Sequence, residues 1–316
     1  MASTFDYETV FVKYFDKKGG LTDQYFNSTP LWERFYGKRK KKNFVSRRPI
    51  YIGLQVTDNA PSTYGELETF TRERKQITEA SYATPANYHN DLVVSWSDVK
   101  REGSPEDMVN MLKARTQNLM QSWAKTMTTA LIEGAGTDDA LLGFENMISE
   151  DGTGTVQGVA SSATKTWWYN KYVNGSDAVI TLPLLHKVTI EGADGQDKPT
   201  LLATDKYLAS YIMTTLLQPR ERYSEGSTKH MSKLPVVYDI PMITDPALET
   251  SGATSGNIWA LNENHLYFLV HPKDDMKRHG QVKPNNQLAY ATDWTLEGQL
   301  VLTQRRKQCL GHSFSV

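Results

Sequence analysis

The stretch SPEDMVNMLKARTQNLMQSWAKTMTTALIE, residues 104–133, decides how the chain is organised. Ser104 suits an N-cap, Pro105 suits a first turn, and glycines follow at the far end. Apolar residues recur along it at helical spacing: Val109, Leu112, Leu119, Trp123, Met127, Ala130 and Leu131. About thirty residues at ~1.5 Å each would make a rod of roughly 45 Å. A helix of that length is unusual in a globular enzyme and predicts a structural spine.

Composition narrows the class of protein. The chain has 316 residues, 39% of them hydrophobic, and a formal net charge of −1. It can therefore bury a core, and attraction to nucleic acid or membrane is not a property of the whole chain. Cys309 is the only cysteine, which excludes an internal disulfide and a cysteine-based zinc site within one chain. No signal peptide and no apolar run of ~18 residues is present, so we expect intracellular synthesis and no membrane contact.

The segments before the spine indicate an arm and a long excursion. Residues 1–48 read as a loosely attached arm with a short helix at 30–35. Strands are predicted at 50–56 and 92–97, with a polar segment of about thirty residues between them. We therefore expect a hairpin-like excursion from the body, and loops that long usually have a function.

A dense basic run lies within residues 33–48. It holds a single acid and eight cations, which are Arg34, Lys38, Arg39, Lys40, Lys41, Lys42, Arg47 and Arg48. Two interpretations stay open, a solvated turn and a patch that faces nucleic acid or acidic side chains. One alternative function is a nucleic-acid-binding protein that uses residues 34–48. Its stacking rings would be Trp32, Phe35 and Tyr36, and its binding would be sensitive to salt.

Three large rings stand side by side in TKTWWYN, residues 164–170, after a run of small and polar residues at 152–163. Neighbouring side chains point to different sides of a helix and to opposite faces of a strand. Trp167, Trp168 and Tyr169 therefore cannot all bury against one core. At least one ring needs a partner in another layer of the chain or in another chain.

The remainder predicts an α+β domain at residues 178–280. Helices are expected at 181–191 and 204–217, the second capped by Thr204. Strands are expected at 200–204, 234–238, 257–261 and 266–270. The C-terminal stretch 287–307 is predicted to be a hairpin that turns near Leu296-Glu297-Gly298.

A search for catalytic motifs finds no convincing match. The seven histidines lack metal-ligand spacing, and no GxSxG or Walker-type loop occurs. Glycines in the 152–158 segment miss the dinucleotide fingerprint by one residue. We therefore expect no enzyme, no cofactor and no metal. The remaining enzyme hypothesis is an unrecognised hydrolase on the α+β domain, which would show a concave site with titratable residues of shifted pKa.

The order of these features resembles the major capsid proteins of tailed bacteriophages, which have the Hong Kong 97-type fold. Five segments carry the resemblance: STPLWERF (28–35), ALLGFENMI (140–148), VQGVASSATKTWWYN (156–170), IWALNENHLYFLVHPKDDMKR (258–278) and QLAYATDWTLEGQLVLTQRRKQCLG (287–311). The resemblance extends over nearly the whole chain, and the joint order and spacing of the five segments make it specific.

The resemblance implies an α+β fold with five segments. Residues 1–48 would be the N-terminal arm, and residues 49–98 an extended loop lying over a neighbouring subunit. Residues 99–177 would be a peripheral domain with the spine helix. Residues 178–280 would be an axial domain around the five- and six-fold axes. Residues 281–316 would be a C-terminal hairpin that returns to the peripheral domain.

The resemblance also implies roles for particular residues. The rings of Trp167, Trp168 and Tyr169 would lie where the peripheral domain passes into the axial domain, one tryptophan filling each side. Glu66 and Glu68 are candidates for contact with another subunit. The candidates for facing packaged DNA are Lys38, Arg39, Lys40, Lys41 and Lys42. Alternatively, these cations would pair with acids of a neighbour's extended loop, namely Glu66, Glu68, Glu73 and Glu79.

The implied partners are further copies of the chain, in hexamers and pentamers of a shell. A portal, packaged double-stranded DNA and, in some members, a cement protein would join them. Because this chain begins close to the arm, we expect scaffolding from a separate protein. Some members form a covalent lysine–asparagine cross-link, which we cannot match here and do not expect. The implied location is the virion, after synthesis in the cytoplasm of a bacterial host.

Overall fold

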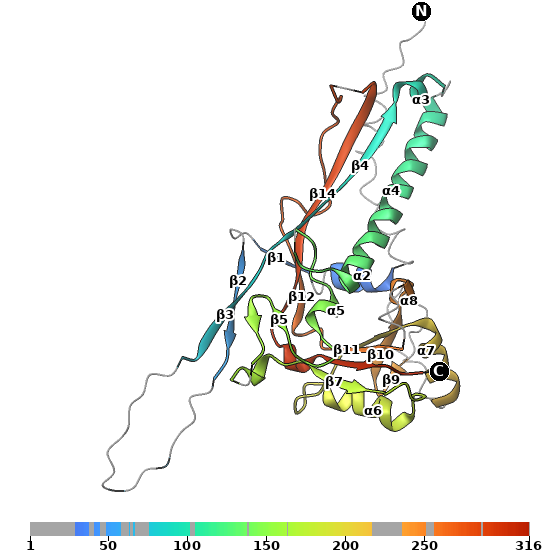
Figure 1. The fold of residues 1–316 in the computed structure, drawn as a ribbon. Helices are drawn as coiled ribbons and strands as arrows, with labels where there is room; N and C mark the ends of the chain where they lie inside the picture. The colour runs from blue at the N-terminus through green and yellow to red at the C-terminus, as the bar shows by residue number, and fades with distance from the viewer. Residues whose placement is uncertain are drawn as a thin grey trace, which may run out of the picture.

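The computed structural model combines an elongated part with a compact part, and a narrow hairpin projects from the side (Figure 1). It describes residues 29–37, 41–44, 49–57, 63, 66, 76–101, 105–137, 139–162, 164–216, 236–250, 256–285 and 287–315. No helix among these residues is long and apolar enough to cross a membrane.

The predicted spine is present as α4, Pro105–Glu133. It runs beside the long strands of the elongated part (Figure 1). Its apolar side chains, such as Leu112 and Met127, are buried in the larger of two core clusters. The short helix α2, Pro30–Tyr36, packs against α4 and has Pro30 in its first turn, as expected. Helix α3, Trp96–Arg101, precedes α4.

The elongated part is built on a five-stranded sheet. Strand β14, Ala289–Leu302, is its centre and pairs antiparallel with β4, Ala86–Ser95. On its other side β14 pairs with β12, Leu266–Val270, and with β13, Lys277–Arg278. Strand β1, Lys41–Asn43, adds to β12 in parallel and attaches the chain that follows α2 to this sheet.

The predicted C-terminal hairpin is wrong, because β14 passes through Leu296-Glu297-Gly298 without turning. Gly298 faces both Ala86 of β4 and Val270 of β12, so it lies where β14 passes from one partner to the other. A Cβ added there would lie 2.7 Å from the Leu269 carbonyl oxygen. The glycine therefore serves close strand packing at this crossing.

The compact part is a six-stranded sheet covered by helices. Its order is β7 (Lys171–Asn174), β15 (Cys309–His312), β11 (Ile258–Leu261), β8 (Leu201–Thr204), β10 (Ile240–Thr244) and β9 (Val236–Val237). Helix α6, Leu182–Glu191, packs on β7, β15 and β11. Alternate residues of β8 enter different cores: Leu202 lies in the smaller cluster, and Leu201 and Ala203 in the larger one.

The second helix of this part differs in detail from the prediction. Helix α7, Lys206–Tyr211, is capped by Asp205, whose carboxylate accepts a hydrogen bond from the Leu208 amide. Thr204 is instead the last residue of β8, so its predicted capping role is wrong. A π-helical turn, Ile212–Leu216, continues α7.

The predicted segment boundary at residue 280 assigns two strands to the wrong sheet. Strand β12 falls in the predicted axial segment but belongs to the five-stranded sheet. Strand β15 falls in the predicted C-terminal hairpin but lies inside the six-stranded sheet, between β7 and β11. The chain thus enters the compact part a second time at its C-terminal end, and the boundary is wrong for both strands.

The projecting hairpin consists of β2, Ile50–Gln55, and β3, Thr78–Ala83. The expected excursion is therefore present, but its second strand is β3. Of the predicted 92–97 strand, residues 92–95 belong to β4, and Trp96 and Ser97 begin α3. Short elements lie between α4 and β7, namely α5 (Phe144–Met147), β5 (Thr155–Val156), β6 (Val159–Ala160) and the 3₁₀-helix η3 (Thr166–Trp168). The remaining elements are α8 (Ala247–Thr250) and the 3₁₀-helix η5 (Arg305–Lys307).

Candidate functional site

The paired tryptophans lie at the passage from the elongated part to the compact part. They are on η3, immediately before β7. Trp168 is buried, and its Nε1 donates a hydrogen bond of 3.2 Å to the Val156 carbonyl oxygen. Trp167 is half-buried, with its ring centroid 5.5 Å from that of Trp168. Both rings pack against the larger core cluster, so the expectation of one ring on each side is wrong. Tyr169 is half-buried.

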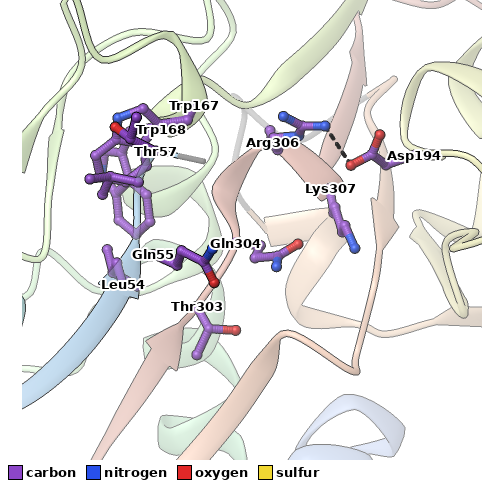
Figure 2. A pocket seen from close by; sticks show the side chains of 11 residues that line it. Leu54, Gln55, Thr57, Trp167, Trp168, Asp194, Thr303, Gln304, Arg306 and Lys307 are labelled. Carbon is purple, nitrogen blue, oxygen red and sulfur yellow. Dashed lines mark hydrogen bonds and ion pairs between the residues drawn. The ribbon is translucent and has the colours of Figure 1, made fainter. Parts of the chain in front are cut away.

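A cavity lies between the tryptophans and the base of the hairpin (Figure 2). It has a volume of 330 Å³. Its walls are residues 54–57 at the end of β2, both tryptophans, Asp194 and four residues around η5. Arg306 Nη2 donates to Asp194 Oδ2 over 2.6 Å across one side, as the dashed line shows. The hairpin thus has open space on its β2 side.

On its β3 side the hairpin is fastened to the segment that contains β5 and β6. The Tyr82 amide donates to the Gln157 carbonyl oxygen over 3.0 Å, and Lys165 forms an ion pair with Glu79. Gln157 and Gly158 have φ of 51° and 73°, which is typical of a two-residue hairpin turn. The Gln-Gly pair between two valines was a usable sequence signal for this turn.

The two faces of the β2–β3 hairpin differ in burial. Ile50, Leu54 and Ala83 are buried against the body. On the opposite face, Tyr51 and Tyr82 stand directly across from each other and are 69% and 47% exposed. A cross-strand pair of large rings is usually found packed, so this face is a candidate contact surface.

The predicted interface acids lie between β2 and β3 in the sequence. Glu66 is exposed in a turn, and Glu68 lies outside the described residues.

The described part of the basic run is engaged within the chain. Lys41 forms an ion pair with Asp275 and lies 4.2 Å from the centre of the Tyr36 ring. Lys42 lies 3.3 Å from the centre of the Tyr267 ring. Lys38, Arg39 and Lys40 lie outside the described residues. Their predicted contact with DNA stays a prediction.

The alternative of a nucleic-acid module on residues 34–48 is not supported. Its proposed stacking rings, Trp32, Phe35 and Tyr36, are all buried in the core. Trp32 stacks on Tyr36 at 4.7 Å and meets Phe268 edge-on. Burial and a hydrogen bond to Asp275 raise the pKa of Tyr36 far above its usual value. Rings held in this way cannot receive bases.

Sequence reasoning missed Arg305, which lies in a run of charged residues that reads as a surface segment. Its side chain is fully buried on η5, between the last residue of β14 and the first of β15. It donates five hydrogen bonds to backbone and hydroxyl oxygens of the segment 147–168. Burial lowers the pKa of the guanidinium to about 10, so it stays charged at neutral pH.

Asp197 is the centre of a titratable group that bears on the enzyme hypothesis. Hydrogen bonds from Lys307 and Asn262 hold its pKa well below the usual range. His265 Nε2 lies 2.9 Å from the same carboxylate, and Thr303 Oγ1 lies 3.4 Å from His265 Nδ1. This order resembles a hydroxyl–histidine–carboxylate triad. However, Lys307 binds the carboxylate and lies 3.3 Å from the same imidazole nitrogen, so the group anchors η5.

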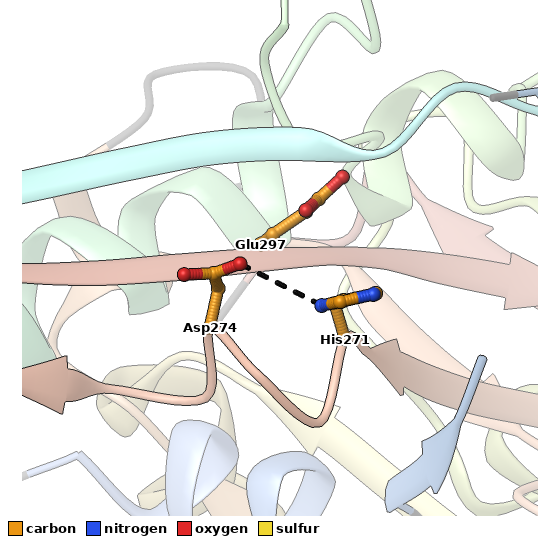
Figure 3. Close-up of side chains that lie close together, drawn as sticks. All are labelled: His271, Asp274 and Glu297. Carbon is orange, nitrogen blue, oxygen red and sulfur yellow. Dashed lines mark ion pairs between the residues drawn. The ribbon is translucent and has the colours of Figure 1, made fainter. Parts of the chain in front are cut away.

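His271, Asp274 and Glu297 are the one group of metal-ligating side chains that comes together in the described part of the chain (Figure 3). One ligand atom of each lies within 4.8 Å of the others. His271 Nδ1 and Asp274 Oδ2 are 3.6 Å apart, too far for a hydrogen bond. All three side chains are partly exposed, and no further ligand of the described residues completes the set. We assign no ion to this group.

Comparisons with known proteins identify the fold. A chain of the cyanophage A-1(L) capsid asymmetric unit matches with a TM-score of 0.67 and 12% identity, covering 94% of this chain and 95% of that chain. The capsid of a native GTA particle matches at 0.62 and 11%, covering 87% and 88%. A Mycobacterium phage Patience chain matches at 0.56 and 10%, covering 100% and 91%.

The sequence matches no protein-family model and no curated protein. At identities this low the structural matches establish fold alone. The chain has the Hong Kong 97-type fold of tailed-phage capsid proteins, and the predicted α+β fold class is confirmed.

Proposed function

We propose that this chain is the major capsid protein of a tailed bacteriophage. Its copies would assemble into the icosahedral head shell that encloses the DNA genome. The observation that carries the proposal is the match to a cyanophage capsid chain over nearly the full length of both chains. A structural role without catalysis is consistent with Asp197, whose carboxylate is engaged by Lys307 and Asn262.

The segments take their roles from this proposal. Residues before β2 act as the arm, and the β2–β3 hairpin is the base of the extended loop. Spine α4 and the five-stranded sheet form the peripheral domain. The six-stranded sheet, completed by β15, forms the axial domain that meets its copies around the five- and six-fold axes.

The hairpin supports assembly by its exposed face. A two-stranded hairpin is marginally stable by itself. Here the face with Ile50 and Leu54 is covered by the chain's own body, whereas Tyr51 is 69% exposed and Tyr82, whose ring lies against Gly158, is still 47% exposed. We propose that the Tyr51–Tyr82 face packs on a neighbouring subunit, because large rings gain free energy when a partner removes them from water.

Other partners follow from the proposed shell. We propose a separate scaffolding protein and a portal during assembly in the bacterial cytoplasm, with a cement protein as an optional addition. Packaged DNA would be held by non-specific phosphate attraction. Lys38, Arg39 and Lys40 stay the candidates for that contact, since Lys41 and Lys42 have partners within the chain.

Assembly of the purified chain tests the proposal. Negative-stain microscopy and light scattering should show closed shells, or rings of five and six subunits. The double variant Tyr51→Ser/Tyr82→Ser should fold normally and assemble less. Tyr207→Ser is the matched control, since Tyr207 is 66% exposed on α7, away from the hairpin. Assembly of the double variant at the level of wild-type protein would exclude the tyrosine face as a subunit contact.

A further inference from the structure

Arg305 has an unusual environment for a buried cation. Its Nε donates to the Met147 carbonyl oxygen over 2.8 Å. Its two terminal nitrogens donate to the carbonyl oxygens of Thr153, Gly154 and Trp168 and to the Ser149 hydroxyl, at 2.6–3.3 Å. A guanidinium has five N–H groups in a fixed planar fork, and these five contacts can use all of them. One side chain thus holds both ends of the segment 147–168.

The same segment carries the hairpin. The Gln157 carbonyl oxygen accepts the Tyr82 amide, and Lys165 pairs with Glu79 on β3. The Gln157 side-chain amide faces the backbone of Leu302, where it can make two hydrogen bonds of 2.8 Å to the end of β14. The segment therefore lies between the hairpin and the connection from β14 to β15.

The β2 side of the hairpin has different surroundings. Leu54 and Val56 pack against the larger core cluster, and residues 55–57 also border the cavity of 330 Å³ (Figure 2). Loss of order in the segment 147–168 would therefore leave the hairpin room to swing towards Trp167 and η5. The hairpin borders the cavity on its β2 side and makes polar contacts with the segment 147–168 on its β3 side. The segment 147–168 is therefore the part that sets the angle of the hairpin.

We infer that Arg305 is a positioning residue, which fixes the direction in which the β2–β3 hairpin leaves the body by clamping the segment 147–168. The clamp itself is a property of the single chain. Its consequence for subunit contacts rests on the proposed capsid function. The hairpin would meet a neighbouring copy at one angle only while the clamp is intact.

A distance measurement between spin labels tests the clamp. Thr78→Cys on β3 and Gln121→Cys on α4 place labels at two exposed positions, and the native Cys309 is buried. Pulsed electron resonance on dispersed subunits, diluted with unlabelled protein, should give one narrow distance distribution. Arg305→Lys keeps the charge but has three donors and no fork. It should at least double the width of the distribution.

Arg306→Lys is the matched control. It is the neighbouring residue on η5, its side chain is half exposed, and it contacts Asp194 rather than the segment. It should leave the width unchanged. Ser149→Ala removes one acceptor of the clamp while keeping Arg305, so it should fold and give a smaller broadening. Unchanged widths in Arg305→Lys and Ser149→Ala would overturn the inference. If Arg305→Lys does not fold, the result for Ser149→Ala decides.

Shell assembly tests the capsid function, and the width of the distance distribution tests the clamp, so the two proposals can fail separately. If wild-type protein never assembles but Arg305→Lys broadens the distribution, the clamp holds and the capsid function fails. If wild-type shells form and the widths do not change, the capsid function holds and the clamp fails.

Discussion

Removal of the Trp168 side chain should destabilise the chain far more than removal of Trp167, although the two residues are neighbours. Trp168 is 1% exposed and part of the larger core cluster, and its ring nitrogen is bonded to the Val156 carbonyl oxygen. Trp167 is half-buried at the wall of the cavity. The difference in burial therefore predicts two different costs for the same substitution to alanine.

The magnitude follows from surface area and the hydrogen bond. A tryptophan buries roughly 200 Å², which at about 25 cal/mol per Å² corresponds to about 5 kcal/mol. Alanine still buries a small part of this area, which reduces the loss. The Val156 carbonyl oxygen, however, loses its hydrogen-bond donor, which costs about 1–3 kcal/mol. We expect Trp168→Ala to cost about 4–5 kcal/mol, within the usual range for such changes. Trp167→Ala should cost about 1–2 kcal/mol, since part of its ring already faces solvent.

Urea unfolding followed by far-ultraviolet circular dichroism measures both costs on dispersed subunits. Trp168→Phe is an informative intermediate, because it keeps a ring and removes only the donor and part of the area. It should cost about 2 kcal/mol. Equal costs for Trp167→Ala and Trp168→Ala, or a neutral Trp168→Ala, would refute the reasoning from burial.

Three further predictions concern other contacts. Gly158→Ala should lower the free energy of unfolding in urea by about 3 kcal/mol, because φ at this residue is positive and its Cβ would overlap the Tyr82 ring. Gly154→Ala, whose Cβ would lie in open space, should lower it by about 1 kcal/mol. The pKa of Asp197 is lowered below its unfolded value of 3.8, so its stabilisation is present above about pH 4 and lost as pH falls; Asp197→Asn should flatten the acid limb of a Tm–pH profile. The pKa of Tyr36 is raised above its unfolded value of 10.0, so the contribution of Tyr36 to stability is full below about pH 10 and is lost as pH rises. Tyr36→Phe should therefore remove this loss from the alkaline limb of the Tm–pH profile.

Sequence reasoning was most successful where local pattern and packing agree. The spine helix α4 begins and ends within a residue of its prediction, because its periodic apolar face, Pro105 and the following Gly134 all indicate the same element. Strands β8, β11 and β12 were also placed, since each is a short apolar run bounded by polar residues.

Pairings between distant strands could not be predicted in the same way. The TEASYA stretch of β3 has small and polar residues, so no apolar alternation identifies it as the partner of β2. Gly298 suggested a turn, but it is required by close packing against β12, which only the tertiary fold reveals. Arg305 is a similar case, because burial of a charged residue depends on acceptors that lie over 130 residues earlier in the chain.

The central claim is that copies of this chain form a shell, and cryo-electron microscopy of the expressed protein tests it most directly. We expect icosahedral particles, in which the six-stranded sheets surround the five- and six-fold axes and each Tyr51–Tyr82 face is covered by a neighbouring subunit. A folded chain that stays monomeric, both alone and when co-expressed with the proteins encoded beside it, would contradict the proposed capsid function.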